Sequence, residues 1–213
     1  MKRLSLLLLL VVLTASGCAG REIMQDNYVK GTAAYDEDYP VDAFILLKPA
    51  ADWGNPNAQY LIATMYDFGR GLRVDHEEAN VWYLRAAQEG QDDAQYNLAI
   101  SYKRGEGIEQ DDAMAIYWLG RAAAQGDQDA LGVLEDYADN GESEAQYAMA
   151  RIYRDGASLH PGNPSLYPDE EDDQAITPDP EQYLYWLNLA AEQGHPEAIK
   201  EAAAVEAALG KGE

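Results

Sequence analysis

The chain repeats itself at a spacing of 36 residues, because the motif Ala-Gln-Tyr begins at Ala58 and again at Ala94. The motif starts a third time at Ala145. The same spacing joins further glycines, an aspartate and a tryptophan: Gly69 with Gly105, Asp75 with Asp111, Trp82 with Trp118, and Gly90 with Gly126. Repeats of this length are supersecondary units that bury their apolar faces only against neighbouring units. The sequence therefore predicts a stacked array and not one globular core.

Each repeat contains two helix-length segments joined by a short turn. In the first segment, Ala94, Leu98 and Tyr102 lie on one helical face. The Gly-x-Gly turn that follows suits residues with positive φ, which end a helix. Asp111 is then placed to cap the second segment, whose apolar stripe includes Trp118. The unit predicts two antiparallel helices, and the recurring tryptophans are expected in the core, although a ligand cage is the alternative.

These motifs resemble the Sel-one-like repeat, a member of the tetratricopeptide-like group of helical hairpins. The residues that carry the resemblance are Ala94 to Ala99, Tyr102, Gly105 to Ile108, Asp111, Ala115, Trp118, Ala122, Ala123, Gln125 and Gly126, together with the stretch from Trp186 to Gly194. The resemblance implies an all-α fold, an α/α superhelical solenoid of helix-turn-helix repeats whose concave face holds protein partners. Many secreted relatives join the two helices by disulfides, which this chain with its single cysteine cannot do.

The regular register is interrupted twice. Residues 127–141 hold only one helix length, and the segment 157–179 carries four prolines and the acidic run 169–173. Proline lacks a backbone donor and the segment has no periodicity, so we expect a loop there. The second helix resumes at Pro180, and a last Ala-rich helix follows. The predicted repeat domain is 31–209 with 157–179 as its insertion loop, and 210–213 is a tail.

The N-terminus predicts export. Lys2 and Arg3 precede an apolar run that is too short to span a membrane, which needs about 20 residues, so residues 1–17 are interpreted as a signal peptide. Small residues then lead to Cys18, a pattern that resembles the lipobox of bacterial lipoproteins, with Ala15 where leucine is usual. The resemblance implies that Cys18 is lipidated with several acyl chains such as palmitate, and an accidental cysteine is the alternative. Residues 18–30 are then a lipidated tether.

Localisation follows from the same resemblance. No aspartate follows Cys18, which resembles the sorting pattern for the periplasmic face of the outer membrane. The net charge is -23, from 15 basic and 38 acidic residues. Nucleic-acid binding requires clustered Lys and Arg to neutralise phosphates, so we expect no nucleic-acid partner.

No motif predicts catalysis, a metal or a cofactor. A zinc site needs three or four convergent ligands, whereas His76, His160 and His195 are isolated and expected at exposed turns. The acidic run 169–173 lacks the ligand spacing of a calcium loop. Ser143 misses the hydrolase elbow motif by one residue, and no strand precedes it; with Gln146 it is expected to form a capping box.

The leading hypothesis is a lipid-anchored periplasmic adaptor for envelope proteins, and not an enzyme. Tyrosines supply contact area at little entropic cost, although the same residues could pack between repeats. The candidate partner-binding residues lie on the first helices of the hairpins: Tyr60, Thr64, Tyr96, Ile100, Tyr147 and Arg151. The alternatives are an envelope hydrolase of cell-wall or β-lactam type, which would lack a Ser-x-x-Lys motif here, and a structural self-assembling spacer.

Overall fold

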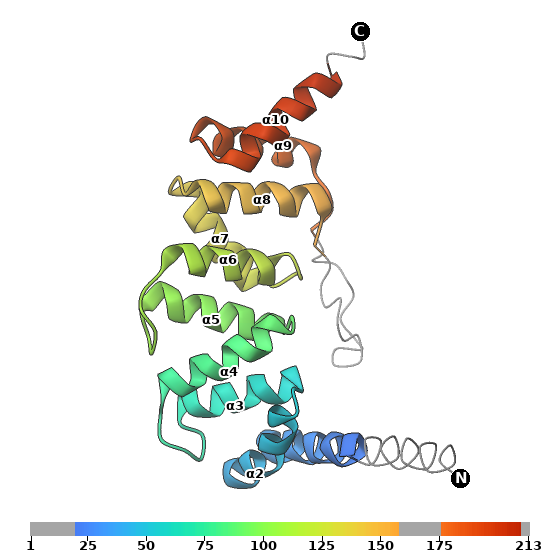
Figure 1. Cartoon of the computed structure of the whole chain (residues 1–213), viewed down its shortest axis with the longest axis vertical. Coiled ribbons are helices and arrows are strands. Elements are labelled where there is room, and N and C mark those ends of the chain that lie inside the picture. The colour runs from blue at the N-terminus through green and yellow to red at the C-terminus, as the bar shows by residue number, and fades with distance from the viewer. Residues whose placement is uncertain (1–19, 158–175, 210–213) are drawn as a thin grey trace, which may run out of the picture. The chain divides into compact units, whose positions relative to one another are not determined.

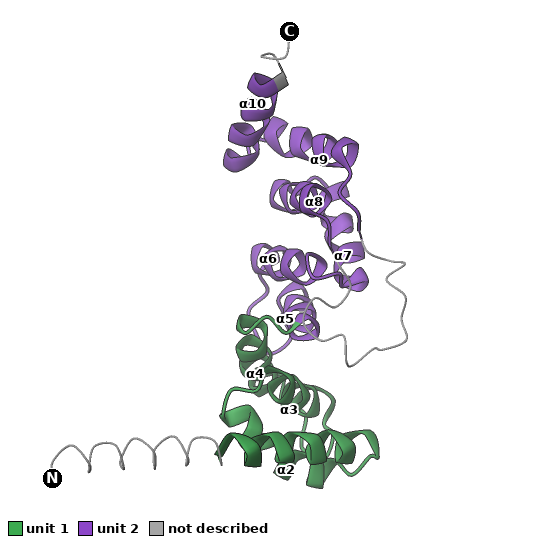
Figure 2. Cartoon of the chain, turned by 90° about the vertical axis from the view of Figure 1, so that its right-hand side faces the viewer, with its two compact units in different colours: residues 1–91 green, residues 92–213 purple. Residues whose placement is uncertain are grey.

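A computed structural model describes residues 20–157 and 176–209, which fall into two compact units, Met1–Gln91 and Asp92–Glu213 (Figures 1 and 2). Apart from an isolated antiparallel bridge between Ala157 and Ile176, every regular element in the described part is a helix. The predicted all-α class of tandem helical hairpins is confirmed. The predicted signal peptide, Cys18, His160, the acidic run and the tail lie outside the described residues.

Unit 1 contains a helix over residues 20–36, followed by α2 (Pro40–Asp52), α3 (Pro56–Phe68) and α4 (His76–Gln88). Helix α2 packs on α3, and α3 packs on α4 as the first hairpin. The core of the hairpin follows the predicted stripes, since Ala58, Ile62 and Trp82 are all buried.

The helix over residues 20–36 corrects the prediction of a tether over 18–30, because residues 20–30 are helical. Arg70, from the Gly-x-Gly turn, donates a hydrogen bond of 3.0 Å to the Tyr35 carbonyl and lies 3.8 Å from the centre of the Tyr35 ring. It also pairs with Asp38 at 3.3 Å. At Gly31 a side chain would meet Leu47 Cγ at 2.7 Å, so glycine permits close packing on α2. This helix is thus part of the folded unit.

Unit 2 contains two hairpins with a single helix between them. Helices α5 and α6 form one hairpin, α8 and α9 form the other, and α7 packs on both α6 and α8. The helices are α5 (Asp92–Arg104), α6 (Asp112–Ala123), α7 (Gln128–Asp139), α8 (Ser143–Asp155), α9 (Pro180–Glu192) and α10 (Pro196–Leu209). The predicted single helix after Gly126 and the delayed start at Pro180 are both confirmed.

Helix ends follow the predicted capping, with one exception. Asp75 and Asp111 accept hydrogen bonds of 3.0 Å from the third backbone N–H of their helices, and Gly105 adopts a φ of 69° in the Gly-x-Gly turn. The capping box at Ser143 and Gln146 is wrong. Helix α8 begins after Glu142 without a side-chain cap. Gln146 is buried instead, and its side chain donates a hydrogen bond to the carbonyl of Ala138 on α7.

The glutamine of each Ala-Gln-Tyr motif is buried and joins neighbouring helices. Gln59 donates to the Ala51 carbonyl at 3.0 Å, and Gln146 donates to the carbonyl of Ala138 at the same distance. Two of these glutamines also accept a hydrogen bond from another glutamine. Gln125 donates to Gln95, and Gln193 donates to Gln146, each at 2.8 Å. The Gln59 Oε1 atom is buried and has no partner in the described part of the chain.

The core tryptophans also differ in whether the indole N–H has a hydrogen-bond acceptor among the described residues. Trp82 Nε1 donates to Glu78 Oε1 at 2.9 Å, one helical turn earlier. Met114 occupies the equivalent place before Trp118. The Trp118 Nε1 atom is buried without an acceptor among the described residues. The prediction that the repeated tryptophans are core residues is confirmed, since Trp186 is also only 5% exposed.

Candidate partner-binding groove

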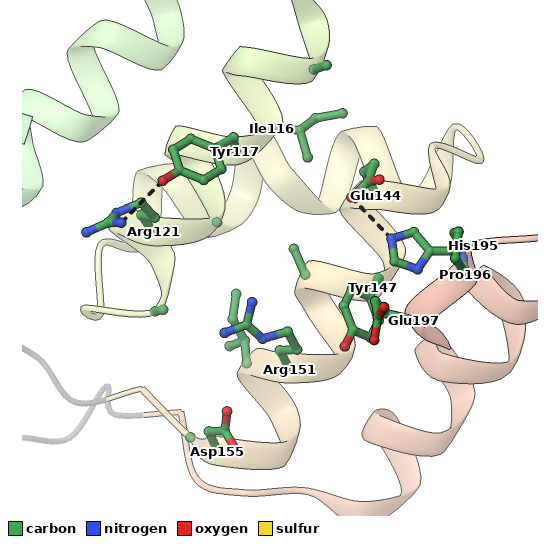
Figure 3. A pocket seen from close by; sticks show the side chains of 16 residues that line it. Ile116, Tyr117, Arg121, Glu144, Tyr147, Arg151, Asp155, His195, Pro196 and Glu197 are labelled. Carbon is green, nitrogen blue, oxygen red and sulfur yellow. Dashed lines mark hydrogen bonds and ion pairs between the residues drawn. The ribbon is translucent and has the colours of Figure 1, made fainter. Parts of the chain in front are cut away.

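A groove of about 780 Å³ lies in unit 2 between α6, α8 and the start of α10 (Figure 3). Helix α7 packs against both α6 and α8. The chain therefore reverses direction twice between α6 and α8, and these two helices run in the same direction. The two helices lie close together at Gly120, where an added Cβ would be 3.4 Å from Ala148 Cβ. Small and apolar residues form much of the lining: Ala113, Ile116, Gly120, Ala124, Ala148, Ile152 and Pro196.

One wall carries Tyr117 and Arg121 of α6. The Arg121 guanidinium donates a hydrogen bond of 3.3 Å to the Tyr117 hydroxyl. It also lies 5.7 Å from the ring centre of Trp118, within cation–π range. The Tyr117 side chain is 51% exposed, so this wall presents an aromatic ring and a cation to solvent.

The other wall carries Tyr147 and Arg151 of α8 (Figure 3). The Tyr147 ring stacks on His195 with centroids 4.4 Å apart, and its hydroxyl donates to Glu201 at 3.1 Å. Burial and the Glu201 carboxylate raise the pKa of Tyr147. Arg151 is exposed and forms no hydrogen bond or ion pair within the described residues. The ring is thus held in place, while the guanidinium has no ion-pair partner in the described part of the chain.

His195 corrects the expectation of an exposed turn, because it is only 6% exposed. Its Nδ1 accepts the Ala198 N–H at 3.2 Å, which caps the start of α10. The hydrogen must therefore be on Nε2, which lies 3.2 Å from a carboxylate oxygen of Glu144. Both ring nitrogens have structural partners, and the ring forms one end of the groove.

Helix α10 is held against α8 and α9 by Glu201. Arg154 and Tyr147 of α8 and Tyr183 of α9 all donate to its carboxylate. Burial raises the pKa of Glu201, but the hydrogen bonds from Arg154, Tyr183 and Tyr147 outweigh burial and lower it overall. Burial and the bond to Glu201 raise the pKa of Tyr183 to about 12. This cluster fixes the end of the groove that α10 supplies.

The structure brings together only some of the predicted contact residues. Tyr147 and Arg151 line the groove. Tyr60, Tyr96 and Ile100 are half-buried on α3 and α5 and do not line it, and their contact with a partner stays a prediction. For Thr64, the predicted contact with a partner is wrong, because its side chain is buried.

Thr64 is only 5% exposed, because it packs beneath the N-terminal helix of unit 1. Its hydroxyl donates to the Leu61 carbonyl at 2.8 Å and lies 3.1 Å from the Tyr35 hydroxyl. A side chain enclosed in this way cannot contact a partner. The prediction failed because the sequence analysis assigned no helix to the segment around Tyr35, which covers Thr64.

Sequence reasoning missed Tyr117 and Arg121, which lie on a second helix of a hairpin. The expected contact surface was confined to first helices. The available signal was the loss of register after Gly126, which places α6 on the same side of α7 as α8. The structure also shows no group of three His, Cys, Asp or Glu side chains within residues 20–157 and 176–209 that could hold a metal. Over the same residues, no helix is long and apolar enough to cross a bilayer.

Comparison with known families identifies the repeats. The Sel1 repeat profile, the Sel-one-like repeat named above, matches residues 56–91, 92–127, 143–166 and 171–195. The first two matches coincide with the hairpins α3–α4 and α5–α6. No curated protein matches the chain.

Solved structures are also similar to this chain. A Sel1 repeat protein from Oxalobacter formigenes is 32% identical, with a TM-score of 0.51 over 60% of this chain and 97% of that protein. A protective antigen present in uropathogenic Escherichia coli strains, which displays an SLR fold, is 23% identical over 88% of this chain, with a TM-score of 0.49. The present chain spans 42% of that antigen's length. The Sel1 repeat profile matches more than half of the chain, which shows that the chain belongs to the Sel1 repeat family.

Proposed function

We propose that this protein is a lipid-anchored adaptor of the bacterial cell envelope that binds a partner protein in the groove between α6, α8 and α10. Sel1 repeat proteins generally mediate protein–protein interactions. The observation that carries the proposal is the composition of the groove, in which exposed Tyr117, Arg121 and Arg151 border an apolar floor. Tyrosine and arginine dominate the energy of protein interfaces, and helices hold them in place.

Anchoring rests on the sequence pattern around Cys18, which supports lipidation and the periplasmic face of the outer membrane. The test is metabolic labelling with radioactive palmitate, followed by separation of inner and outer membranes. The wild-type protein is expected to carry label and to fractionate with the outer membrane. Cys18→Ser is expected to lose both, and label that persists in this variant would contradict the anchor.

Partner binding is tested by site-specific photo-crosslinking in cells. A photoreactive amino acid replaces Tyr117 in the groove or, as the matched control, Tyr185 on α9, which is 54% exposed and outside the groove. We expect defined crosslinked products from position 117 only. Their loss in an Ala113→Trp variant, which fills the groove from an exposed position on α6, would assign them to the groove. Equal products from both positions, or none, would refute an adaptor that works through this surface.

We infer binding without turnover. His195 and Tyr147 use their polar atoms to hold α10, so neither is available as a catalytic base in this arrangement. Release of soluble fragments from peptidoglycan, or hydrolysis of a chromogenic β-lactam, by the purified protein would instead support the envelope hydrolase. A self-assembling spacer is distinguished by light scattering, where the adaptor is expected to remain a monomer.

A further inference from the structure

We propose that the groove recognises an acidic linear peptide, whose apolar side chain packs on the floor while its carboxylates pair with Arg121 and Arg151. This inference rests on the proposed adaptor function and names the chemistry of the partner segment. It arises from an imbalance in how the charged side chains around the groove are paired.

The carboxylates around the groove already have donors beside them, a neutral imidazole N–H for Glu144 and a cation for each of the other two. Glu144 lies 3.2 Å from His195, and Asp155 lies 2.8 Å from the guanidinium of Arg154. Glu197 lies 3.7 Å from the Lys200 ammonium. A basic peptide entering the groove would have to compete with these contacts.

Arg121 and Arg151 differ, since neither forms an ion pair with a carboxylate within the described residues, and Arg151 acts on Asp155 only at longer range. Among residues 20–157 and 176–209, Arg121 contacts the Tyr117 hydroxyl and neighbouring rings, which orient the guanidinium without neutralising it. Arg151 is exposed on the facing wall (Figure 3). A guanidinium presents a fork of N–H donors that matches a carboxylate, so both positions suit acidic side chains.

The pairing matters because acidic residues outnumber basic ones in this chain, with 38 Asp and Glu against 15 Lys and Arg. A net charge of -23 favours basic partners at long range. That field is screened beyond about 8 Å at physiological ionic strength, whereas a contact inside a groove is not. The local pairing therefore selects the ligand once it has arrived.

The floor defines the rest of the ligand. Ile116 and Ile152 are at most 5% exposed, and Ala148 between the walls is small enough to leave room above it. A floor of this kind removes an apolar side chain from water, which contributes about 25 cal/mol for each Å² buried. The expected peptide therefore has Asp or Glu within a residue or two of an apolar side chain.

The experiment selects random linear peptides displayed on phage against the soluble protein, with the signal peptide removed and Cys18→Ser. Peptides that bind the wild type but not Ala113→Trp are kept as groove-dependent, and circular dichroism checks that Ala113→Trp remains folded. Their affinities are then measured at physiological ionic strength for Arg121→Gln and Arg151→Gln. Arg73→Gln, on an exposed turn of unit 1, is the matched control.

We expect the groove-dependent peptides to be enriched in Asp and Glu next to apolar residues. Each groove substitution is expected to weaken binding about fivefold, the effect of one charge-assisted contact that is partly open to solvent. Arg73→Gln should bind as the wild type does. Neutral or basic groove-dependent peptides, or unchanged affinity in both groove variants, would overturn the inference.

The two proposals fail separately. If photo-crosslinks form at position 117 but no acidic peptide depends on the groove, the acidic preference is wrong and the adaptor function stands. If neither crosslinks nor groove-dependent peptides are found, both are wrong.

Discussion

The buried Oε1 atom of Gln59 has no hydrogen-bond donor among the described residues, and the single substitution Glu89→Gln is expected to supply one. In unit 2, Gln125 supplies the donor to Gln95, 30 residues earlier. Glu89 stands 30 residues after Gln59, so it occupies the equivalent place in unit 1. A carboxylate at that place accepts hydrogen bonds and cannot donate one, which explains why Gln59 Oε1 is unpartnered.

The backbone is already suited to the change. Glu89 has φ -82° and ψ 2°, whereas Gln193, which donates to Gln146, has φ -84° and ψ 0°. A glutamine at position 89 would therefore leave its helix with the same geometry as Gln193. A new hydrogen bond to a buried acceptor contributes about 1 kcal/mol. For a chain of this size that raises Tm by about 2–4 °C.

The assay is urea and thermal unfolding of the soluble form, followed by circular dichroism at neutral pH and physiological ionic strength. Two controls separate the hydrogen bond from the loss of one negative charge. Glu109→Gln removes an exposed carboxylate elsewhere, and Gln59→Leu removes the acceptor. An equal gain in Glu109→Gln, or a gain from Glu89→Gln that persists in the Gln59→Leu background, would refute the reasoning.

Three further predictions test other contacts. Met114→Glu should give Trp118 Nε1 the acceptor that it lacks and raise the free energy of unfolding by about 1 kcal/mol, measured by urea unfolding. Glu201→Gln should destabilise the protein near neutral pH. Because the folded-state pKa of Glu201 is lowered, its contribution is present above the usual pKa of the group and is lost as pH falls through the folded value, so wild type and variant should converge in acid; a constant difference would contradict this. Arg70→Ala should cost about 1–2 kcal/mol at the contact with Tyr35. The readout is amide hydrogen exchange, which should speed up over residues 20–36 and not in α8.

The parts of the fold that sequence could predict are local ones. Asp75 and Asp111 cap helices because a carboxylate three positions before a free N–H needs no distant neighbour. The tryptophan stripe follows from helical spacing alone. Ser143 had the right local chemistry but the wrong outcome, because Gln146 is used between helices and is not available as a cap.

The parts that escaped prediction depend on contacts far apart in the chain. Residues 20–36 have no counterpart in the repeat, and their helix is held by Arg70, 35 residues away from Tyr35. His195 is buried because Tyr147 stacks on it, 48 positions earlier in the chain. Such pairs follow from how helices pack, and a single sequence carries no periodic signal for them.

The change of repeat register after Gly126 also suggests a deletion that would remove the groove. Deleting residues 127–141 joins Gly126 directly to Glu142. Ala145 then stands four residues after a helix-ending glycine, as Ala94 does after Gly90. The regular spacing of the repeats is restored by this deletion.

The shortened chain is expected to fold, because the buried Gln146 side chain keeps a backbone carbonyl as its acceptor. Gln146 now donates to Ala138, eight residues earlier, and in the shortened chain the residue eight positions earlier is Ala123. Without α7, however, one turn separates α6 from α8 and the two helices become antiparallel neighbours. Arg121 and Arg151 then no longer face a shared groove, so groove-dependent peptides should bind at least tenfold more weakly, while unfolding stays cooperative. Retained binding would show that α7 does not build the site, and loss of folding would show that the repeats depend on it.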